Sequence, residues 1–280
     1  MHLEQQAKLI RAIGIHALLV LVALIFAIPV VVMVLGSFST DDQVLANLSR
    51  WSFSSGSMTL ENYGDVIARV PFWRYLFNSF AINLAIVALG LVVNSIAGYA
   101  IARLRWSARR LALSFVLALL IIPFEAIAIP LFLQLSWLGW RDTLAVQVAP
   151  FVANPLSIYL FYSFFLRFPR ELEEAARVDG AGVIRTFVSI VVPNSKPVFA
   201  SVAIVTFLFN WGMYLWPLLI TTSESVRPLP LGIATFYTLP PMAWGDVLAF
   251  GVMMILPVLI VFALLQRWFV RGVATTGMKG

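Results

Sequence analysis

Few side chains in this sequence could do acid–base or metal chemistry. The chain has no cysteine, and its two histidines, His2 and His16, both lie near its start. A zinc site built from Cys and His ligands therefore cannot be assembled. The apolar runs hold no paired carboxylates, and no GxxxxGK[ST] loop that would cradle a nucleotide occurs. We predict a protein that is not an enzyme, has no catalytic residues, and binds neither a metal ion nor a cofactor.

The bulk composition indicates an integral membrane protein. Hydrophobic residues make up 61% of the chain, charged residues make up 11%, and the mean hydropathy is +0.94. These values exceed what soluble globular proteins carry. A helix needs about 20 apolar residues to cross the hydrocarbon core of a bilayer. We predict an all-α protein with six transmembrane helices, at about 12–36, 75–101, 111–135, 144–166, 198–220 and 246–269.

The distribution of basic residues sets the expected orientation. The formal net charge is +6, but the lysines and arginines are scattered between apolar runs, so nucleic acid is not an expected partner. With the N-terminus in the cytoplasm, most of them fall in the inner segments, as the positive-inside rule expects. We therefore place both termini in the cytoplasm and the chain in the cell (cytoplasmic) membrane as a multi-pass protein. The first apolar run is too long for a cleaved signal peptide.

We expect two parts along the chain. Residues 1–71 would hold the first transmembrane helix and an outer loop, whose Ser, Thr, Asn and Asp content near 41–63 favours irregular structure. Residues 72–280 would hold the other five helices, with a cytoplasmic loop at 167–197 between the fourth and fifth.

Polar side chains inside the predicted spans are candidates for a substrate path. Glu125 is the one carboxylate deep within a predicted span, and a residue that costly to bury usually faces a cavity or a partner. It could accept hydrogen bonds from substrate hydroxyls or be a solvated structural carboxylate. Asn83 and Asn94 share a helical face with Gly90 and Ala97, and such a face favours helix packing over ligand contact.

A second polar face is expected in the fifth span. Four residues recur there at steps of three or four and would align on a continuous helix: Thr206, Asn210, Tyr214 and Pro217. Aromatic planes beside hydroxyl and amide groups suit a sugar, although a packing seam would use the same residues. The candidate substrate-path residues are Glu125, Asn83, Asn94, Asn154, Thr206, Asn210, Trp211 and Tyr214.

The stretch ELEEAARVDGAG at 171–182 is unusually charged for this chain, with five ionisable side chains in twelve positions. We predict two short helices in this loop. The first begins at Pro169, pairs Glu173 with Arg177, and ends at a hinge formed by Gly180, and the second is stopped by Pro193.

These two helices would be amphipathic. An apolar side is expected from Leu172, Ala175, Ala176, Val183, Ile184 and Phe187, with the carboxylates and arginines on the other side. Small Ala175 and Ala176 would let another surface come close, and Glu174 could accept a hydrogen bond from it. A solvated loop would need neither the spacing nor the small residues.

This segment resembles the EAA signature of the permease subunits of ABC importers. The match consists of Glu174-Ala175-Ala176, then Gly180, Ile190 and Pro193 at the family spacing, with Val192 in place of the usual Leu. The resemblance extends over most of the chain and is closest to the carbohydrate importers, through PFWRYLFNS at 71–79, IIPFEAIAIPLF at 121–132, WGMYLWPLLIT at 211–221 and the ending QRWFVRGVATTGMKG. Gly212 departs from the family, which commonly has Asn after this Trp.

The resemblance implies a type I ABC importer permease fold. It implies a second homologous permease subunit, two ATP-binding subunits that use ATP and Mg, an extracytoplasmic solute-binding protein, and surrounding membrane lipid as partners. The cargo would be a sugar or sugar-like solute, moved by alternating access. The residues that would couple to the ATPase are Glu174, Ala175, Ala176, Asp179, Gly180, Ile190 and Pro193.

Two other transport functions are weighed against this interpretation. An ABC permease for a non-sugar solute would keep the same coupling loop and differ only in cargo. An ion-coupled secondary transporter normally carries ionisable relays at mid-membrane within repeated broken helices. The chain offers only Glu125 and no evident repeat, so the second of these is disfavoured.

Overall fold

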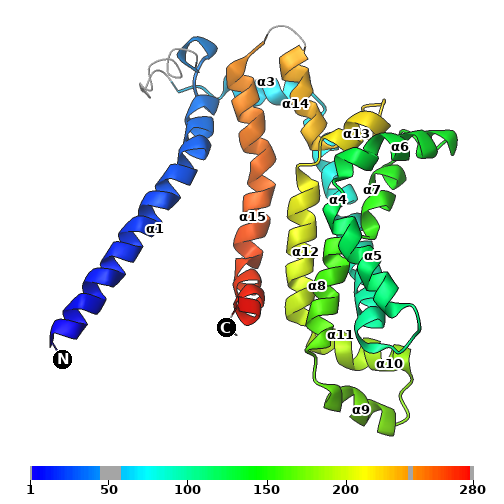
Figure 1. Cartoon of the computed structure of the whole chain (residues 1–280). Coiled ribbons are helices and arrows are strands. Elements are labelled where there is room, and N and C mark those ends of the chain that lie inside the picture. Colours follow the sequence, from blue (N-terminus) through cyan, green and yellow to red (C-terminus); the bar gives the residue numbers. More distant parts are fainter. Residues whose placement is uncertain (1, 45–57, 239–241, 278–280) are drawn as a thin grey trace. The chain divides into compact units, whose positions relative to one another are not determined.

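The computed structural model describes residues 2–44, 58–238 and 242–277, and these are helical wherever they have regular structure. The chain forms two compact units: Met1–Val70 with Ile233–Ile255, and Pro71–Gly232 with Leu256–Gly280. The helices, shown in Figure 1, are α1 (His2–Ser37), α3 (Glu61–Arg69), α4 (Phe72–Arg103), α5 (Arg109–Ile121), α6 (Phe124–Trp137), α7 (Leu144–Val152), α8 (Pro155–Leu166), α9 (Arg170–Val178), α10 (Val183–Thr186), α11 (Val192–Asn194), α12 (Lys196–Trp211), α13 (Leu215–Ile220), α14 (Leu229–Thr238) and α15 (Trp244–Gly277).

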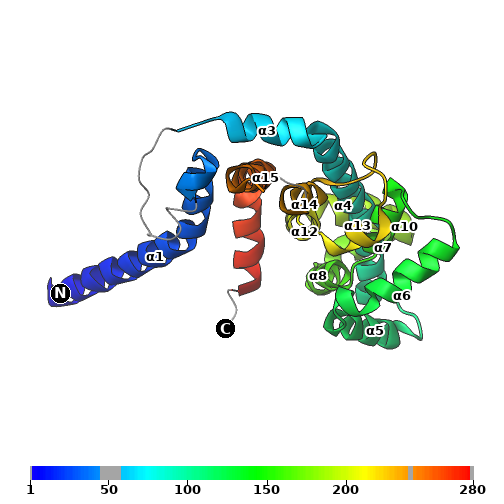
Figure 2. The same ribbon diagram turned by 90° about the horizontal axis from the view of Figure 1, so that it is seen from above.

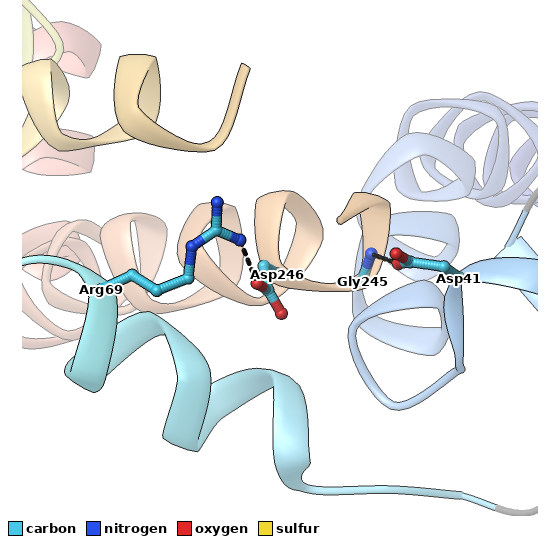
Figure 3. A network of polar contacts seen from close by, with 4 residues as sticks. All are labelled: Asp41, Arg69, Gly245 and Asp246. Carbon is cyan, nitrogen blue, oxygen red and sulfur yellow. Dashed lines mark hydrogen bonds and ion pairs between the residues drawn. The ribbon is translucent and has the colours of Figure 1, made fainter. Parts of the chain in front are cut away.

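The first unit is held together by polar contacts at the start of α15. The guanidinium of Arg69, at the end of α3, lies 2.7 Å from the Asp246 carboxylate and over the ring of Phe236. The Asp41 carboxylate accepts a hydrogen bond of 2.8 Å from the Gly245 amide, so it supplies a partner for one of the free amides of α15 (Figure 3). Most of the expected irregular loop, residues 45–57, lies outside the described residues, but α3 follows it as a helix that the sequence did not predict.

The second unit is built around α4. Helices α7, α8 and α12 pack against it (Figures 1 and 2). Gly98 permits the closest approach, because a Cβ atom there would lie 2.6 Å from the Cβ of Phe161 on α8. Aromatic rings fill the interface beside it, including Tyr99, Phe161 and Phe165.

Three predicted spans correspond to single long helices, α1, α4 and α15, the span 144–166 is divided between α7 and α8, and the other two are broken. With α7 and α8 counted as one, four helical stretches among the described residues are long and apolar enough to cross a membrane, or up to six if each of two bent pairs, α5 with α6 and Val183–Asn194 with α12, is one span. The predicted span 111–135 bends by 102° between α5 and α6, where Ile122 precedes Pro123 and is therefore disfavoured in helical geometry. The predicted span 198–220 is wrong as one helix, because α12 ends at Trp211 and α13 begins at Leu215.

A short turn between α6 and α7 is fixed by one carboxylate. The Oδ1 atom of Asp142 accepts hydrogen bonds from the amides of Thr222 (2.8 Å) and Ser223 (2.9 Å), while its own amide donates to Ile220. These backbone hydrogen bonds stabilise the carboxylate and lower the pKa of Asp142 from 3.8 to about 2. The turn thereby joins the start of α7 to the chain that follows α13.

The first prediction concerns the contact between α4 and α8. Gly98→Ala should destabilise the protein by about 1–3 kcal/mol, because the added methyl overlaps the α8 backbone and side chain. Gly64→Ala on α3 is the matched control, since a Cβ there meets nothing within 4 Å. Thermal unfolding of the purified transporter measures both, and equal stability of the two variants would contradict the packing described.

The second prediction concerns the turn at Asp142. Its folded-state pKa lies below 3.8, so its stabilising effect is present above that pH and is lost as the pH falls toward about 2. Hydrogen exchange of the Thr222 and Ser223 amides, corrected for intrinsic rates, should therefore accelerate within this window. Asp142→Asn keeps an acceptor oxygen without the charge, so its exchange should be faster at neutral pH and should lack the acid transition. Unchanged protection in the variant would refute the assignment.

Candidate functional site

The charged loop begins with α9, whose ends are set by local chemistry. Pro169 precedes the helix, and Glu171 and Glu173 lie in its first turn, where the helix dipole favours negative charge. After Asp179 the chain turns at Gly180, whose φ of +80° is the left-handed conformation that glycine adopts easily. The amides of Gly180 and Ala181 donate to the carbonyls of Arg177 and Ala176, which is a Schellman ending. The predicted hinge at Gly180 is thus a helix terminator.

The carboxylate of Glu173 fastens α9 to α4. The sequence predicted that Glu173 pairs with Arg177, and this is wrong: Glu173 accepts a hydrogen bond of 2.9 Å from Nε of Arg103. Both side chains are buried, with 5% of Arg103 and 6% of Glu173 exposed. The long-range pair prevails because burial makes an unpaired charge costly, whereas an exposed pair along one helix contributes little.

The apolar side of this loop is mostly left open by the chain itself. Of the residues predicted to form it, Ala176 is buried and Phe187 packs its ring 4.9 Å from that of Tyr99. The others are exposed: Leu172, Ala175, Val183 and Ile184. Val178 is 88% exposed and Ile184 80%. Glu174 and Asp179 are also exposed, so this end of the unit, opposite α13 in Figure 1, presents both apolar and acidic groups.

The second helix of the loop contains a wider turn than expected. After α10 the chain forms a π-helical turn over Phe187–Val191, which holds Ile190, and then continues into α11. Pro193 was predicted to stop this helix, but the helix ends one residue later, at Asn194. Pro193 has no amide hydrogen to donate, and the wider turn before it, in which the amide of Val192 bonds to the carbonyl of Phe187, accommodates the missing bond.

Three of the substrate-path candidates meet at a small polar cavity in the second unit. Asn83, Asn210 and Trp211 line a space of about 20 Å³ together with Ser79 and Gln147. Gln147 was not predicted for this site, although it stands out as a lone amide within the apolar run LAVQVAP. The side-chain oxygens of Asn83 and Gln147 are buried there without a hydrogen-bond partner. A cavity of this volume holds about one water molecule.

Other candidates stabilise breaks between helices. The amide of Asn94 bridges the gap between α7 and α8: its Nδ2 donates to the carbonyl of Val152 (2.9 Å), and its Oδ1 accepts from the amide of Asn154 (2.9 Å). Asn154 caps α8 by accepting from the amide of Ser157, whose hydroxyl lies 3.4 Å from that of Thr206. Asn94 thus forms hydrogen bonds across a helix contact, which favours the packing interpretation.

The last two candidates lie apart from these groups. Glu125 lies in the first turn of α6 and is exposed, not deep within a continuous helix. Tyr214 precedes α13 beyond the end of α12, so the polar face predicted from Thr206 to Pro217 is interrupted. Among the described residues, no group of three or more acidic or histidine side chains could hold a metal ion.

Comparison with known families decides what kind of protein carries this arrangement. Residues 90–275 match the family model described as binding-protein-dependent transport system inner membrane component. The chain belongs to this family. It is therefore a multi-pass membrane protein and a transport component, not an enzyme.

Relatives of this transport component match along most of its length. The chain is 32% identical to the arabinooligosaccharides transport system permease protein of Halalkalibacterium halodurans, over 92% of this chain and 93% of the relative. It is 33% identical to the trehalose/maltose transport system permease protein of Thermococcus litoralis, over 93% and 94%. It is 36% identical to the sn-glycerol-3-phosphate transport system permease protein of Yersinia enterocolitica, over 72% and 73%.

The fold also matches that of a solved transporter. A chain in the crystal structure of a bacterial ABC transporter that imports the acidic polysaccharide alginate superposes with a TM-score of 0.79 and 24% sequence identity. The match covers 93% of this chain and 96% of the other. The permease has the fold of an ABC importer subunit, as the sequence predicted.

The third prediction tests the buried ion pair of the permease. Glu173→Leu should cost about 3–5 kcal/mol of stability, because it leaves the Arg103 guanidinium buried without its counter-charge. Removing both charges, in Arg103→Met with Glu173→Leu, should recover most of that loss. Glu171→Leu, at an exposed carboxylate of the same helix, serves as the control and should change stability by less than about 0.5 kcal/mol. A double variant no more stable than Glu173→Leu would show that the pair is not coupled.

Proposed function

We propose that this permease is one of two membrane-spanning subunits of an ATP-driven sugar importer, and that α9 and α10 couple it to a separate ATPase on the cytoplasmic side. The observation that carries this proposal is the exposed face of the loop. Val178 and Ile184 are 88% and 80% exposed, and Val178 lies on α9, outside every candidate span. Exposed apolar side chains in such a segment are typical of an interaction surface.

The anchoring of α9 supports a mechanical role. Its underside is tied to the end of α4 by the buried Arg103–Glu173 pair, while Glu174 and Ala175 face outward. A push on the outward face would therefore reach α4 directly. A nucleotide can bias a conformational equilibrium only through contacts that differ between the states, and a surface fastened to one long helix provides such a contact.

The partners follow from membership in a binding-protein-dependent system. We infer a second, homologous permease subunit, two ATP-binding subunits that hold ATP and Mg, and an extracytoplasmic solute-binding protein. Both termini of the permease would be cytoplasmic. The coupling residues would be Glu174, Ala175, Ala176, Asp179, Gly180, Ile190 and Pro193. Of these, Ala176 lies on the buried side of α9, and Ile190 and Pro193 lie in and just after the π-helical turn that follows α10.

The cargo is inferred to be a sugar or a sugar-like solute. The relatives described above carry arabinooligosaccharides, trehalose or maltose, and sn-glycerol 3-phosphate in their names. The cavity lined by Asn83, Asn210 and Trp211, at about 20 Å³, is too small for a sugar ring, so a path there would require these helices to separate during transport. Glu125, exposed at the bend before α6, would then be a polar group on the wall of that path.

The fourth prediction tests coupling at the exposed face. Ala175→Trp places a bulky ring where the partner would dock, and it should reduce both co-purification of the ATP-binding subunits and substrate-stimulated ATP hydrolysis by at least about tenfold, since a misfit at a packed interface removes the contacts that hold it. Ala175 is exposed, so the variant should fold. Ala68→Trp, at an exposed alanine of α3, is the matched control. Retained ATPase binding and coupled hydrolysis in Ala175→Trp would refute the assignment.

The cargo is tested separately through the binding protein of the same system. A thermal-shift screen against oligosaccharides, sugar alcohol phosphates, amino acids and phosphate should raise the melting temperature only with a carbohydrate or its phosphate, because ligand binding stabilises the folded state. A shift confined to amino acids or to inorganic phosphate would favour the non-sugar ABC permease.

A further inference from the structure

A basic cavity lies between the end of α4, the start of α5 and the start of α9. It has a volume of about 450 Å³. Two carboxylates, Glu173 and Glu174, and five arginines line it: Arg103, Arg105, Arg109, Arg170 and Arg177. The positive charges therefore exceed the negative ones by three, and Glu173 is already paired with Arg103. A hollow whose lining carries a net positive charge attracts anions.

The start of α5 adds to this positive potential. The helix begins with Arg109 and Arg110, has no acidic residue in its first turn, and receives no side-chain hydrogen bond from its N-cap residue Ala108. The N-terminal end of a helix carries a partial positive charge and favours anions. The two arginines therefore add their charge to that of the helix end and strengthen its attraction for an anion.

A buried donor at the wall of the cavity points the same way. The side chain of Arg103 is 5% exposed, and Glu173 takes only its Nε. The Nη2 atom of Arg103 is buried without a hydrogen-bond partner. Buried polar groups are nearly always paired, so this nitrogen leaves an unmet donor and an uncompensated part of a positive charge beside the cavity.

We propose that this cavity binds a phosphate group, held by Arg105 and Arg109 together with the amides at the start of α5. Guanidinium groups bind phosphate in paired, charge-assisted hydrogen bonds, and helix starts bind the same group through their free amides. Its source would be an anionic phospholipid. Next to the cavity, Trp106 is 41% exposed, and α5 continues with exposed apolar residues, among them Leu111 and Phe115, so acyl chains attached to the phosphate would have an apolar surface to follow.

A lipid phosphate suits the cavity better than a protein carboxylate does. Basic pockets between helices at the cytoplasmic membrane surface recognise anionic lipid headgroups, and the apolar α5 surface beside the arginines has no counterpart in a soluble acidic partner. The assignment rests on the proposed cytoplasmic orientation of this end. Its test measures binding and not transport, so its failure is distinguishable from a failure of the proposed function.

The experiment uses the assembled transporter in nanodiscs of phosphatidylcholine with or without phosphatidylglycerol. After extraction, native mass spectrometry counts the phosphatidylglycerol molecules retained on the complex. The variant Arg105→Gln with Arg109→Gln should lower the association constant about fivefold for each arginine removed, and salt should lower retention by the wild type further. Both arginines are exposed, so the fold should persist.

The matched control removes two exposed cations that do not line the cavity, through Arg185→Gln with Lys196→Gln. It should retain phosphatidylglycerol like the wild type. A second arm adds inorganic phosphate or sn-glycerol 3-phosphate to the complex in phosphatidylcholine alone and measures the thermal shift. A shift that depends on Arg105 and Arg109, without lipid retention, supports the phosphate site and assigns it to a free phosphate. Equal behaviour of the cavity variant and the control in both arms overturns the proposal. The proposal is also overturned if the cavity variant loses the ATP-binding subunits but still retains phosphatidylglycerol like the wild type.

Discussion

The ion pair between Arg103 and Glu173 is the constraint on which the position of α9 depends. Two charges withdrawn from water are costly unless each has a close partner, and here one lies at the end of α4 and the other on α9. Because α4 is also the helix against which α7, α8 and α12 pack, a nine-residue helix is tied to the centre of the second unit. One side of α9 is held against α4 by this pair, and the opposite side, with Glu174 and Ala175, remains exposed.

A similar logic governs the breaks within the apolar segments. A chain that bends inside a membrane exposes backbone groups that lipid cannot satisfy. The gap between α7 and α8 solves this with Asn94, which supplies a donor and an acceptor to the two sides of the break. The side chain of Trp216 likewise satisfies a backbone group in α7, because its Nε1 donates a hydrogen bond to the carbonyl of Val146. The polar side chains of Asn94 and Trp216 thus form hydrogen bonds with backbone groups of neighbouring helices.

Much of this architecture could be predicted because it depends on short-range patterns in the sequence. Apolar run length predicted the long helices, and the density of charge at 171–182 predicted a helix outside them. The partner of Glu173 could not be predicted, because rules for pairs along one helix do not reach Arg103, 70 positions away. The breaks at Pro123 and Gly212 had visible signals, but the direction taken after each break depends on contacts between distant segments.

The π-helical turn at Phe187–Val191 has a consequence for how the permease tolerates changes in length. An α-helix rotates by about 100° per residue, and this turn holds a residue more than an α-helical path would need. Loss of one residue here would swing Ile184 and everything before it around the helix axis, away from the direction in which Phe187 meets Tyr99. Insertions and deletions should accordingly be far less acceptable in these five positions than conservative replacements. The orientation of α9 and α10 relative to the helices that follow is therefore set by the number of residues in this turn as well as by their types.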